Sequence, residues 1–254
     1  NPGPVFVWVH LFDPHAPYAP PASFAFADAY RGEVAAADAA LATLMAVWNA
    51  RPGANVVAAT SDHGEAFGEH GEWSHSLFVY DTTLRVPLIL RGGGLKAGAR
   101  VPVTVGLTDL AATLLDVSGA PAKLPGESLR GALAEGARDR TLYAETLAPR
   151  FDFGWSELRA YREGGYKWIR APKPELYALA DDAAEAQNLA LRDRAKGASL
   201  DASMNDLLGR TGDRQAHRGG DAEGAERLRS LGYVQGPGGR GSGADPKDRV
   251  ELAK

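Results

Sequence analysis

Two apolar runs separated by a long amphipathic segment constrain the fold of this chain most strongly. Residues 5–12 (VFVWVHLF) are continuously apolar, as in a buried parallel strand, and residues 55–62 (NVVAATSD) begin with a second such run. Between them, residues 28–50 carry apolar side chains at helical spacing and end at Arg51-Pro52-Gly53, a sequence that stops helices. This strand–helix–strand order predicts a βαβ unit with a parallel strand pair.

The downstream pattern adds strands of a different kind. Residues 85–94 predict a core strand that ends in a glycine loop, and residues 141–146 predict another strand. Residues 157–172 alternate in polarity around Gly164-Gly165, which indicates a β-hairpin. The chain is therefore expected to be α/β, with parallel strands first and antiparallel strands later.

A further amphipathic helix is predicted over residues 107–119. Thr108 is placed to serve as its N-cap, and Gly119 is placed to end it. A second, polar and alanine-rich helical stretch is expected after residues 176–182.

Two parts of the chain differ in composition. We expect residues 1–208 to form the folded domain and residues 209–254, rich in Gly, Asp and Arg, to form a linker or poorly ordered tail with one short helix near GAERLRSLGYV. The chain opens almost directly on a core strand and closes on DPKDRVELAK. We therefore expect both ends to be cut from a longer protein.

Charge and composition exclude several classes of function. The 254 residues carry a formal net charge of -4 without a strong block of one sign, which argues against nucleic acid as a partner because phosphate binding needs a basic face. No apolar run approaches the roughly 18 residues of a membrane span. Cysteine is absent, so the chain has no disulfide, thiolate zinc site or cysteine nucleophile.

The densest chemistry lies in residues 60–75, TSDHGEAFGEHGEWSH, which hold three of the six histidines. Asp62 and His63 directly follow an expected strand, and His15 follows the other, so both fall where open α/β sheets bind ligands. Gly64 allows a sharp turn that could aim carboxylate and imidazole at one ion. Oxygen and nitrogen ligands suit a divalent metal, although two ligands do not complete a site.

Each of these residues also has a plain structural interpretation. Asp-His-Gly is often only a turn, and His15 could be a loop histidine bonded to backbone. The remaining polar residues of these segments are expected to be structural or solvated: Asp13 as an Asx-turn former, His10 as a satisfied buried histidine, and His70, Glu65, Glu69 and Glu72 as solvated loop residues.

Several motifs, in order, resemble the sulfatase family of the alkaline-phosphatase-like superfamily. The resemblance covers roughly residues 5–190 and rests on these blocks: VWVHLFDPHAPYAPP, YRGEVAAADAAL, TSDHGEAFGEHGEWSHSLFVYDTTLRVPLIL and GLTDLAATLLDVSGAP followed by GESL. The tail piece ERLRSLGYVQG also resembles a segment that follows this domain in bacterial members.

The resemblance implies a fold and a reaction. The fold would be a mixed, mainly parallel sheet flanked by helices, with a small C-terminal antiparallel sheet region. The reaction would be hydrolysis of a sulfate ester around a divalent cation, most often Ca²⁺, with Mg²⁺, Mn²⁺ or Zn²⁺ as other candidates. The nucleophile would be a formylglycine made from Cys or Ser in a C/S-x-P-x-R motif.

Carried over residue by residue, the resemblance assigns four roles. Asp62 and His63 match the second metal-ligand pair of the family, and His15 matches a histidine that contacts the transferring group. His75 matches a position where members place Lys or His toward the sulfate or the leaving oxygen. These roles agree with the chemistry, because cationic donors stabilise the charge spread over a sulfuryl group and an imidazole can protonate a departing oxygen.

The chain departs from the family in two ways. No C/S-x-P-x-R motif is present, and neither is the upstream Asp-Asp pair. We therefore expect the chain alone to be an inactive fragment of an enzyme that acts on a small-molecule or glycan sulfate ester. Family resemblance makes a periplasmic or other extracytoplasmic location plausible, and helical repeats could follow residue 254.

Two alternatives stay open at this point. A phosphate or phosphonate ester hydrolase of the same superfamily would use an unmodified Thr or Ser nucleophile instead of formylglycine. A non-catalytic binding module on the same scaffold would need no nucleophile. Arg150, Phe151 and Trp155 could line the mouth of a site, or the aromatic rings could pack between sheets.

Overall fold

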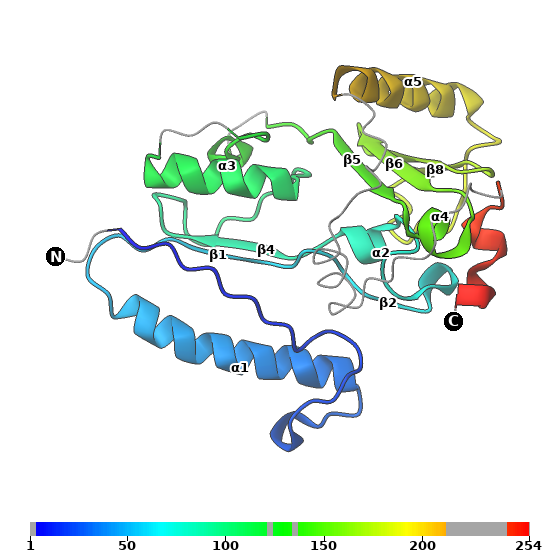
Figure 1. Cartoon of the computed structure of the whole chain (residues 1–254). Helices are drawn as coiled ribbons and strands as arrows, with labels where there is room; N and C mark the ends of the chain where they lie inside the picture. Colours follow the sequence, from blue (N-terminus) through cyan, green and yellow to red (C-terminus); the bar gives the residue numbers. More distant parts are fainter. Residues whose placement is uncertain (1–3, 121–123, 134–136, 212–242, 254) are drawn as a thin grey trace. The chain divides into compact units, whose positions relative to one another are not determined.

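The computed structural model describes residues 4–120, 124–133, 137–211 and 243–253. The chain divides into two compact units, residues 1–57 and residues 58–254 (Figure 1).

The first unit is built around one long helix. Helix α1 spans Ala29–Asn49, and Asp28 caps it by accepting the backbone N–H of Arg31 at 3.2 Å. A short 3₁₀ turn, η1 (Ala22–Phe24), precedes it. Gly32 is required by space, because a Cβ there would lie 2.3 Å from the Phe24 carbonyl oxygen. The predicted helix over residues 28–50 is confirmed.

The strand predicted over residues 5–12 is wrong for this structure. Residues 4–12 carry no strand, and their side chains are exposed, with Phe6 at 81% and Trp8 at 82%. A strand exists only when a neighbour takes up its backbone hydrogen bonds, and no described strand pairs with this segment. The predicted βαβ unit is therefore absent, and the mainly parallel sheet is not found in the described residues.

The second unit contains three small sheets. Strands β1 (Val57–Thr60) and β4 (Leu88–Arg91) pair with each other, as do β2 (Ala66–Phe67) and β3 (Trp73–Ser74), the latter pair antiparallel. The largest sheet has four strands that pair antiparallel and follow one another in chain order. They are β5 (Leu142–Thr146), β6 (Leu158–Glu163), β7 (Tyr166–Arg170) and β8 (Glu175–Ala178).

The small C-terminal antiparallel region is confirmed, and so is its hairpin. Gly164 and Gly165 form the two-residue turn between β6 and β7, with φ values of 58° and 78°. Both central residues of such a turn need positive φ, which glycine adopts without strain.

Four described helices belong to the second unit: α2 (Asp81–Leu84), α3 (Leu107–Ser118), α4 (Ala148–Phe153) and α5 (Arg194–Thr211). Gly119 ends α3 at φ 68°, as predicted. Thr108 is not the cap. The N-cap is Gly106, and the Asp109 carboxylate accepts its N–H at 3.0 Å.

Two apolar clusters use opposite faces of the four-stranded sheet. One contains Leu77–Tyr80 with Leu158, Ala160 and Ile169, and the other contains Tyr161 and Leu176 with Leu200 and Met204 of α5. The alternation Leu158, Ala160 against Tyr161 follows the period of two along a strand. Trp155 is buried in the first cluster, so its ring packs in the core.

The structure describes the last part of the expected tail. Residues 243–253 include two 3₁₀ turns, η4 (Pro246–Asp248) and η5 (Val250–Ala253). Residues 212–242, with the short helix expected near 224–234, lie outside the described residues. No described helix is long and apolar enough to cross a membrane.

Candidate metal and catalytic site

Asp62 and His63 lie at the turn that follows β1. Their side chains are 74% and 30% exposed, so solvent and ions reach both. The His63 ring places Nδ1 2.7 Å from the Gly64 carbonyl oxygen. A carbonyl only accepts, so Nδ1 carries the hydrogen and Nε2 carries the lone pair that a metal needs.

The two donors are spaced for one ion. His63 Nε2 lies 3.8 Å from Asp62 Oδ1, which allows a cation about 2.0–2.4 Å from each atom. Gly64 is needed at this turn because a side chain would not fit there, and not because its backbone is left-handed. A Cβ there would lie 2.3 Å from the Thr82 carbonyl oxygen, and the Gly64 N–H donates to Thr83 at 2.7 Å.

The pair does not form a complete site on its own. No group of three or more His, Asp or Glu side chains in the described parts of the chain is arranged to hold an ion. The residues present therefore fit a metal as two of its ligands, with correct donor types and tautomer, and further ligands must come from elsewhere.

His75 lies against the same turn. Its ring stacks on the His63 ring with centroids 3.9 Å apart and planes at 27°. His75 Nδ1 lies 3.3 Å from Glu65 Oε1 and 3.1 Å from Ser74 Oγ. A carboxylate only accepts, so this contact favours the tautomer with hydrogen on Nδ1 and the lone pair on Nε2.

The backbone around His75 is strained. Ser74 and Ser76, on either side of it, have φ values of 86° and 82°, a region that residues with a Cβ rarely adopt. Such conformations persist only where surrounding contacts enforce them, and they concentrate at functional sites. One enforcing contact comes from Thr146 at the end of β5, whose hydroxyl donates to the Ser76 carbonyl oxygen.

Glu65 and Glu72 are not solvated loop residues, which corrects the expectation from the sequence. The Glu65 side chain is 6% exposed, and Glu72 is 4% exposed. Glu72 Oε1 accepts the backbone N–H groups of Leu77 at 2.7 Å and Phe78 at 3.2 Å. Burial, with a smaller contribution from Glu65, raises the pKa of Glu72 to about 7. Glu69 is exposed, as expected.

The other histidines correct two further expectations. His70 is not solvated, because its ring stacks on Tyr80 with centroids 3.6 Å apart and burial lowers its pKa. His10 is exposed rather than buried. His15 lies in the first unit, where its Nδ1 is 2.7 Å from the Ala16 carbonyl oxygen and its ring stacks on Phe12. These contacts match the backbone-bonded alternative.

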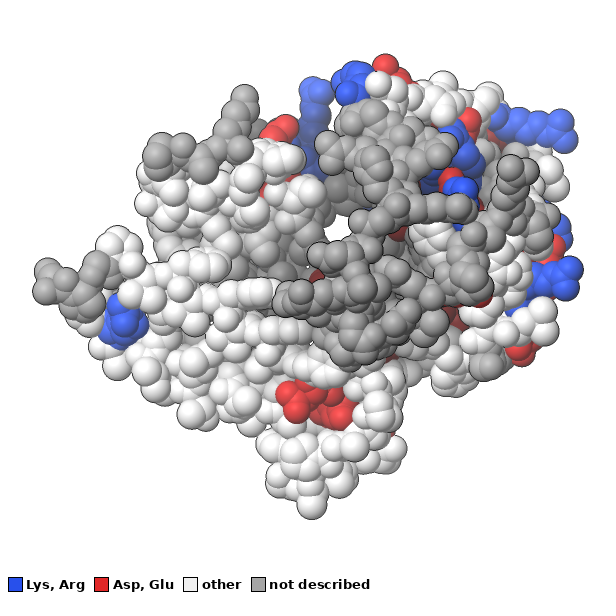
Figure 2. All heavy atoms as spheres, viewed as in Figure 1, with Lys and Arg blue, Asp and Glu red and all other residues white. Residues whose placement is uncertain are grey.

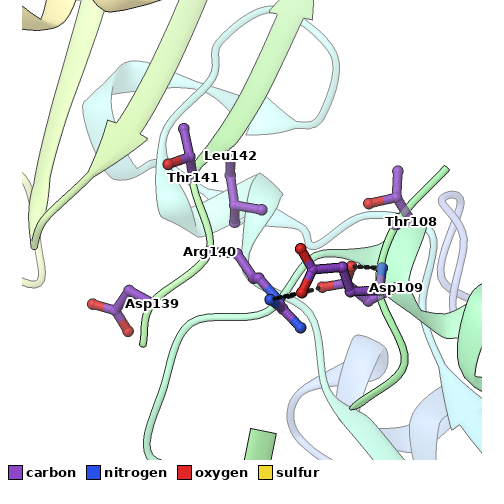
Figure 3. Close-up of a pocket in the computed structure, with 8 residues that line it drawn as sticks. Thr108, Asp109, Asp139, Arg140, Thr141 and Leu142 are labelled. Carbon is purple, nitrogen blue, oxygen red and sulfur yellow. Dashed lines mark hydrogen bonds and ion pairs between the residues drawn. The ribbon is translucent and has the colours of Figure 1, made fainter. Parts of the chain in front are cut away.

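A pocket of about 550 Å³ lies elsewhere in the second unit, between the start of α3 and the segment before β5 (Figure 3). Asp109 and Arg140 both line it and form an ion pair, with Arg140 Nε 3.5 Å from Asp109 Oδ2. Asp109 also accepts backbone N–H groups of Gly106 and Glu127, so it holds the helix start and the following loop together. None of the four predicted site residues lines this pocket.

Sequence reasoning missed Glu65 and Glu72 as site residues. Both were grouped with exposed Glu69 because all three belong to one polar loop. The available signal was position, since Glu65 directly precedes the pair of short strands and Glu72 lies between Gly71 and Trp73, where the chain must turn back.

Comparisons with known proteins show similarity to sulfatases. Residues 1–120 match the family described as Sulfatase. The chain is 30% identical over 166 residues to arylsulfatase K of Mus musculus, a match that covers 60% of this chain and 30% of that protein. The chain thus spans less than a third of the length of this curated relative.

Solved structures share the fold. A candidate sulfatase from Bacteroides thetaiotaomicron has a TM-score of 0.61 at 23% identity, over 84% of this chain and 47% of that one. The phosphonate monoester hydrolase of Agrobacterium radiobacter has a TM-score of 0.56 at 25% identity, over 72% and 41%. A protein solved with its substrate D-glucosamine-2-N,6-O-disulfate has a TM-score of 0.53 at 21% identity, over 76% and 40%.

Fold and sequence together show similarity to sulfatases, over the fold of the described residues and over residues 1–120 of the sequence. Within that similarity, residues 1–120 match the sulfatase family model, and the curated proteins similar over longer stretches are named arylsulfatase K.

Proposed function

We propose that this chain supplies the second metal-ligand pair and the leaving-group histidine of a metal-dependent sulfuric ester hydrolase. One observation carries the proposal. Asp62 Oδ1 and His63 Nε2 lie 3.8 Å apart, and the His75 ring is stacked directly on the His63 ring. Two proposed ligands and a second imidazole thereby lie side by side.

Asp62 and His63 would hold the cation, with Ca²⁺ the leading candidate. The bound ion would offset negative charge on the oxygens of the sulfuryl group. His75 would donate a proton from Nε2 to the departing oxygen when its ring is doubly protonated, and the Glu65 carboxylate beside Nδ1 would stabilise that cationic ring. His15 is proposed to contact the transferring group.

The nucleophile is not part of this chain, because the sequence contains no C/S-x-P-x-R motif. The proposed function therefore belongs to a larger protein, and the 254-residue chain by itself is expected to be inactive. The substrate class is a sulfate ester of a small molecule or glycan, a proposal supported by the structural relative that was solved with a disulfated glucosamine.

A second candidate is hydrolysis of a phosphonate or phosphate ester. It is favoured by the structural match to a phosphonate monoester hydrolase, which at 25% identity exceeds the identity to the candidate sulfatase. Both reactions move a tetrahedral anionic group past a metal, so the ligand pair alone does not separate them.

The test uses the intact parent protein. Turnover of nitrophenyl sulfate is expected to exceed turnover of nitrophenyl phosphate, and the reverse ratio would favour the second candidate. Asp62→Ala and His63→Ala should each reduce bound metal and activity together. Glu69→Gln, in the same loop, is the matched control and should leave both near the parent values.

His75 is tested in the same protein. Because its proposed role is at the substrate, His75→Ala should lower turnover by about 10²–10⁴-fold, the usual contribution of a general acid, with metal content unchanged. Equal loss of metal and turnover would assign His75 a metal or structural role. Unchanged metal and turnover in all three alanine variants would contradict the assignment and leave a binding module.

A further inference from the structure

The C-terminal segment, defined as residues 243–253, is held in place by buried charged groups. Asp245 is 3% exposed, and its carboxylate accepts the Lys173 backbone N–H at 2.8 Å and the Lys247 N–H at 3.0 Å. The Ala244 carbonyl oxygen accepts the Ser156 N–H at 3.0 Å. A buried carboxylate without such partners would be costly, so the segment is held in a specific position rather than laid on the surface.

The same segment contacts the loop that carries His75. Val250 lies against Gly71, where a Cβ on the glycine would come within 3.1 Å of Val250 Cγ1. Ala244, Val250 and Ala253 pack on the cluster formed by Leu77–Tyr80 and its neighbours. The segment, red in Figure 1, therefore touches the loop at Gly71 and packs on the cluster to which Leu77–Tyr80 belong.

Lys247 links the segment to the loop through charge. Its Nζ forms an ion pair with Glu175, a carboxylate whose side chain is 5% exposed, and donates to the Lys173 carbonyl oxygen at 2.9 Å. Glu175 Oε2 in turn accepts the Tyr80 hydroxyl at 2.7 Å. Without Lys247, the buried Glu175 carboxylate would lose its cationic partner. Removal of one partner from a buried ion pair is strongly destabilising, because it leaves an uncompensated charge.

Tyr80 transmits this contact to the loop. Its ring stacks on the ring of His70, which precedes His75 in the loop. Tyr80 itself belongs to the buried run Leu77–Tyr80, which follows His75. The amides of Leu77 and Phe78 are those bound by Glu72. The loop from His70 to Tyr80 is thus held by hydrogen bonds to its own Glu72 and by contacts with the C-terminal segment.

We propose that the C-terminal segment positions the His75 loop, with Lys247 as the positioning residue. The catalytic consequence rests on the role proposed for His75, whereas the structural coupling between segment and loop does not. The segment lies far from residues 62–75 in the sequence. In this proposal it adjusts the geometry of the site and contributes no group to it.

Hydrogen exchange on the 254-residue chain tests the coupling. Lys247→Met keeps the apolar stem and removes the charge, and amides in residues 71–80 should exchange at least about tenfold faster, because opening of the segment releases the loop. Met204 on α5 lies in the other cluster, and its amide should not change. Lys247→Arg should restore slow exchange, and Lys96→Met, at an exposed lysine, should have no effect.

The result that overturns the proposal is specific. If amides in residues 243–253 lose protection in Lys247→Met while those in 71–80 keep theirs, the segment does not hold the loop. If Lys247→Met does not fold, Val250→Ala applies the same comparison through the apolar contact with Gly71.

Turnover of the parent protein separates this inference from the proposed function. A changed pH profile in Lys247→Met with unchanged metal content supports positioning of His75. Faster exchange in 71–80 with an unchanged pH profile would keep the coupling and count against the role of His75.

Discussion

At the scale of single residues, burial changes the chemistry of this site more than residue identity does. Three glutamates lie within eight positions, and only Glu69 behaves as a surface carboxylate. Glu65 is turned toward His75, and Glu72 is enclosed beneath Leu77 and Phe78. Both backbone amides bind Oε1 of Glu72, so Oε2 can carry a proton without loss of either bond.

The ionisation of Glu72 should make stability depend on pH. Its pKa is raised from 4.5 to about 7, so the folded chain keeps a proton that the unfolded chain has released across this window. The free energy of unfolding should therefore fall as pH rises from about 4.5 to 7, by about 3 kcal/mol from this group. Glu72→Gln, which keeps an acceptor for the two amides, should lose that dependence.

Urea unfolding of both proteins at pH 5 and pH 8 measures this difference. At pH 8 the variant should be the more stable protein, because it has no buried charge at this position. Parallel pH dependence in the two proteins would show that Glu72 is ionised throughout.

At the scale of elements, the start of α3 depends on a residue three positions inside the helix. The Asp109 carboxylate accepts the N–H groups of Gly106 and Glu127 while 4% exposed, and it faces Arg140. Thr108, the cap expected from the sequence, is exposed. Capping by side-chain type alone does not identify which residue is held in reach of the orphan amides.

Alanine substitution distinguishes the two caps. Asp109→Ala leaves two partly buried N–H groups without this acceptor and should lower the free energy of unfolding by about 1–3 kcal/mol. Thr108→Ala, the matched control at the predicted cap, should change it by less than about 0.5 kcal/mol. Thermal or urea unfolding measures both, and comparable losses would restore Thr108 as a capping residue.

At the scale of the whole molecule, the chain presents apolar side chains that a stable monomer would bury. Residues 5–12 expose Phe6, Trp8 and their neighbours in an extended segment without a described strand partner. Extended apolar backbone of this kind pairs readily with another chain. The charged surface does not oppose such contact with one sign, since the face in Figure 2 carries both Lys or Arg and Asp or Glu side chains.

The chain is therefore expected to self-associate. Phe6→Ser with Trp8→Ser should reduce light scattering at a given concentration and leave the thermal midpoint nearly unchanged, because neither side chain is buried. Val47→Ser is the matched control, since Val47 is 68% exposed but lies on α1, where backbone hydrogen bonds are already satisfied. Association that responds equally to both changes would contradict a role for the extended segment.

Local patterns of the sequence determined α1, the Gly164-Gly165 hairpin and the turn after Asp62-His63, because capping, positive φ and helical spacing act over a few residues. Whether Val5–Phe12 becomes a strand was decided by tertiary structure, since a strand needs a partner that its own residues cannot provide. Tertiary structure also decided the burial of Glu65 and Glu72 and the position of Lys247 beside Glu175. Lys247, for example, donates to the carbonyl oxygen of Lys173, 74 positions away in the chain.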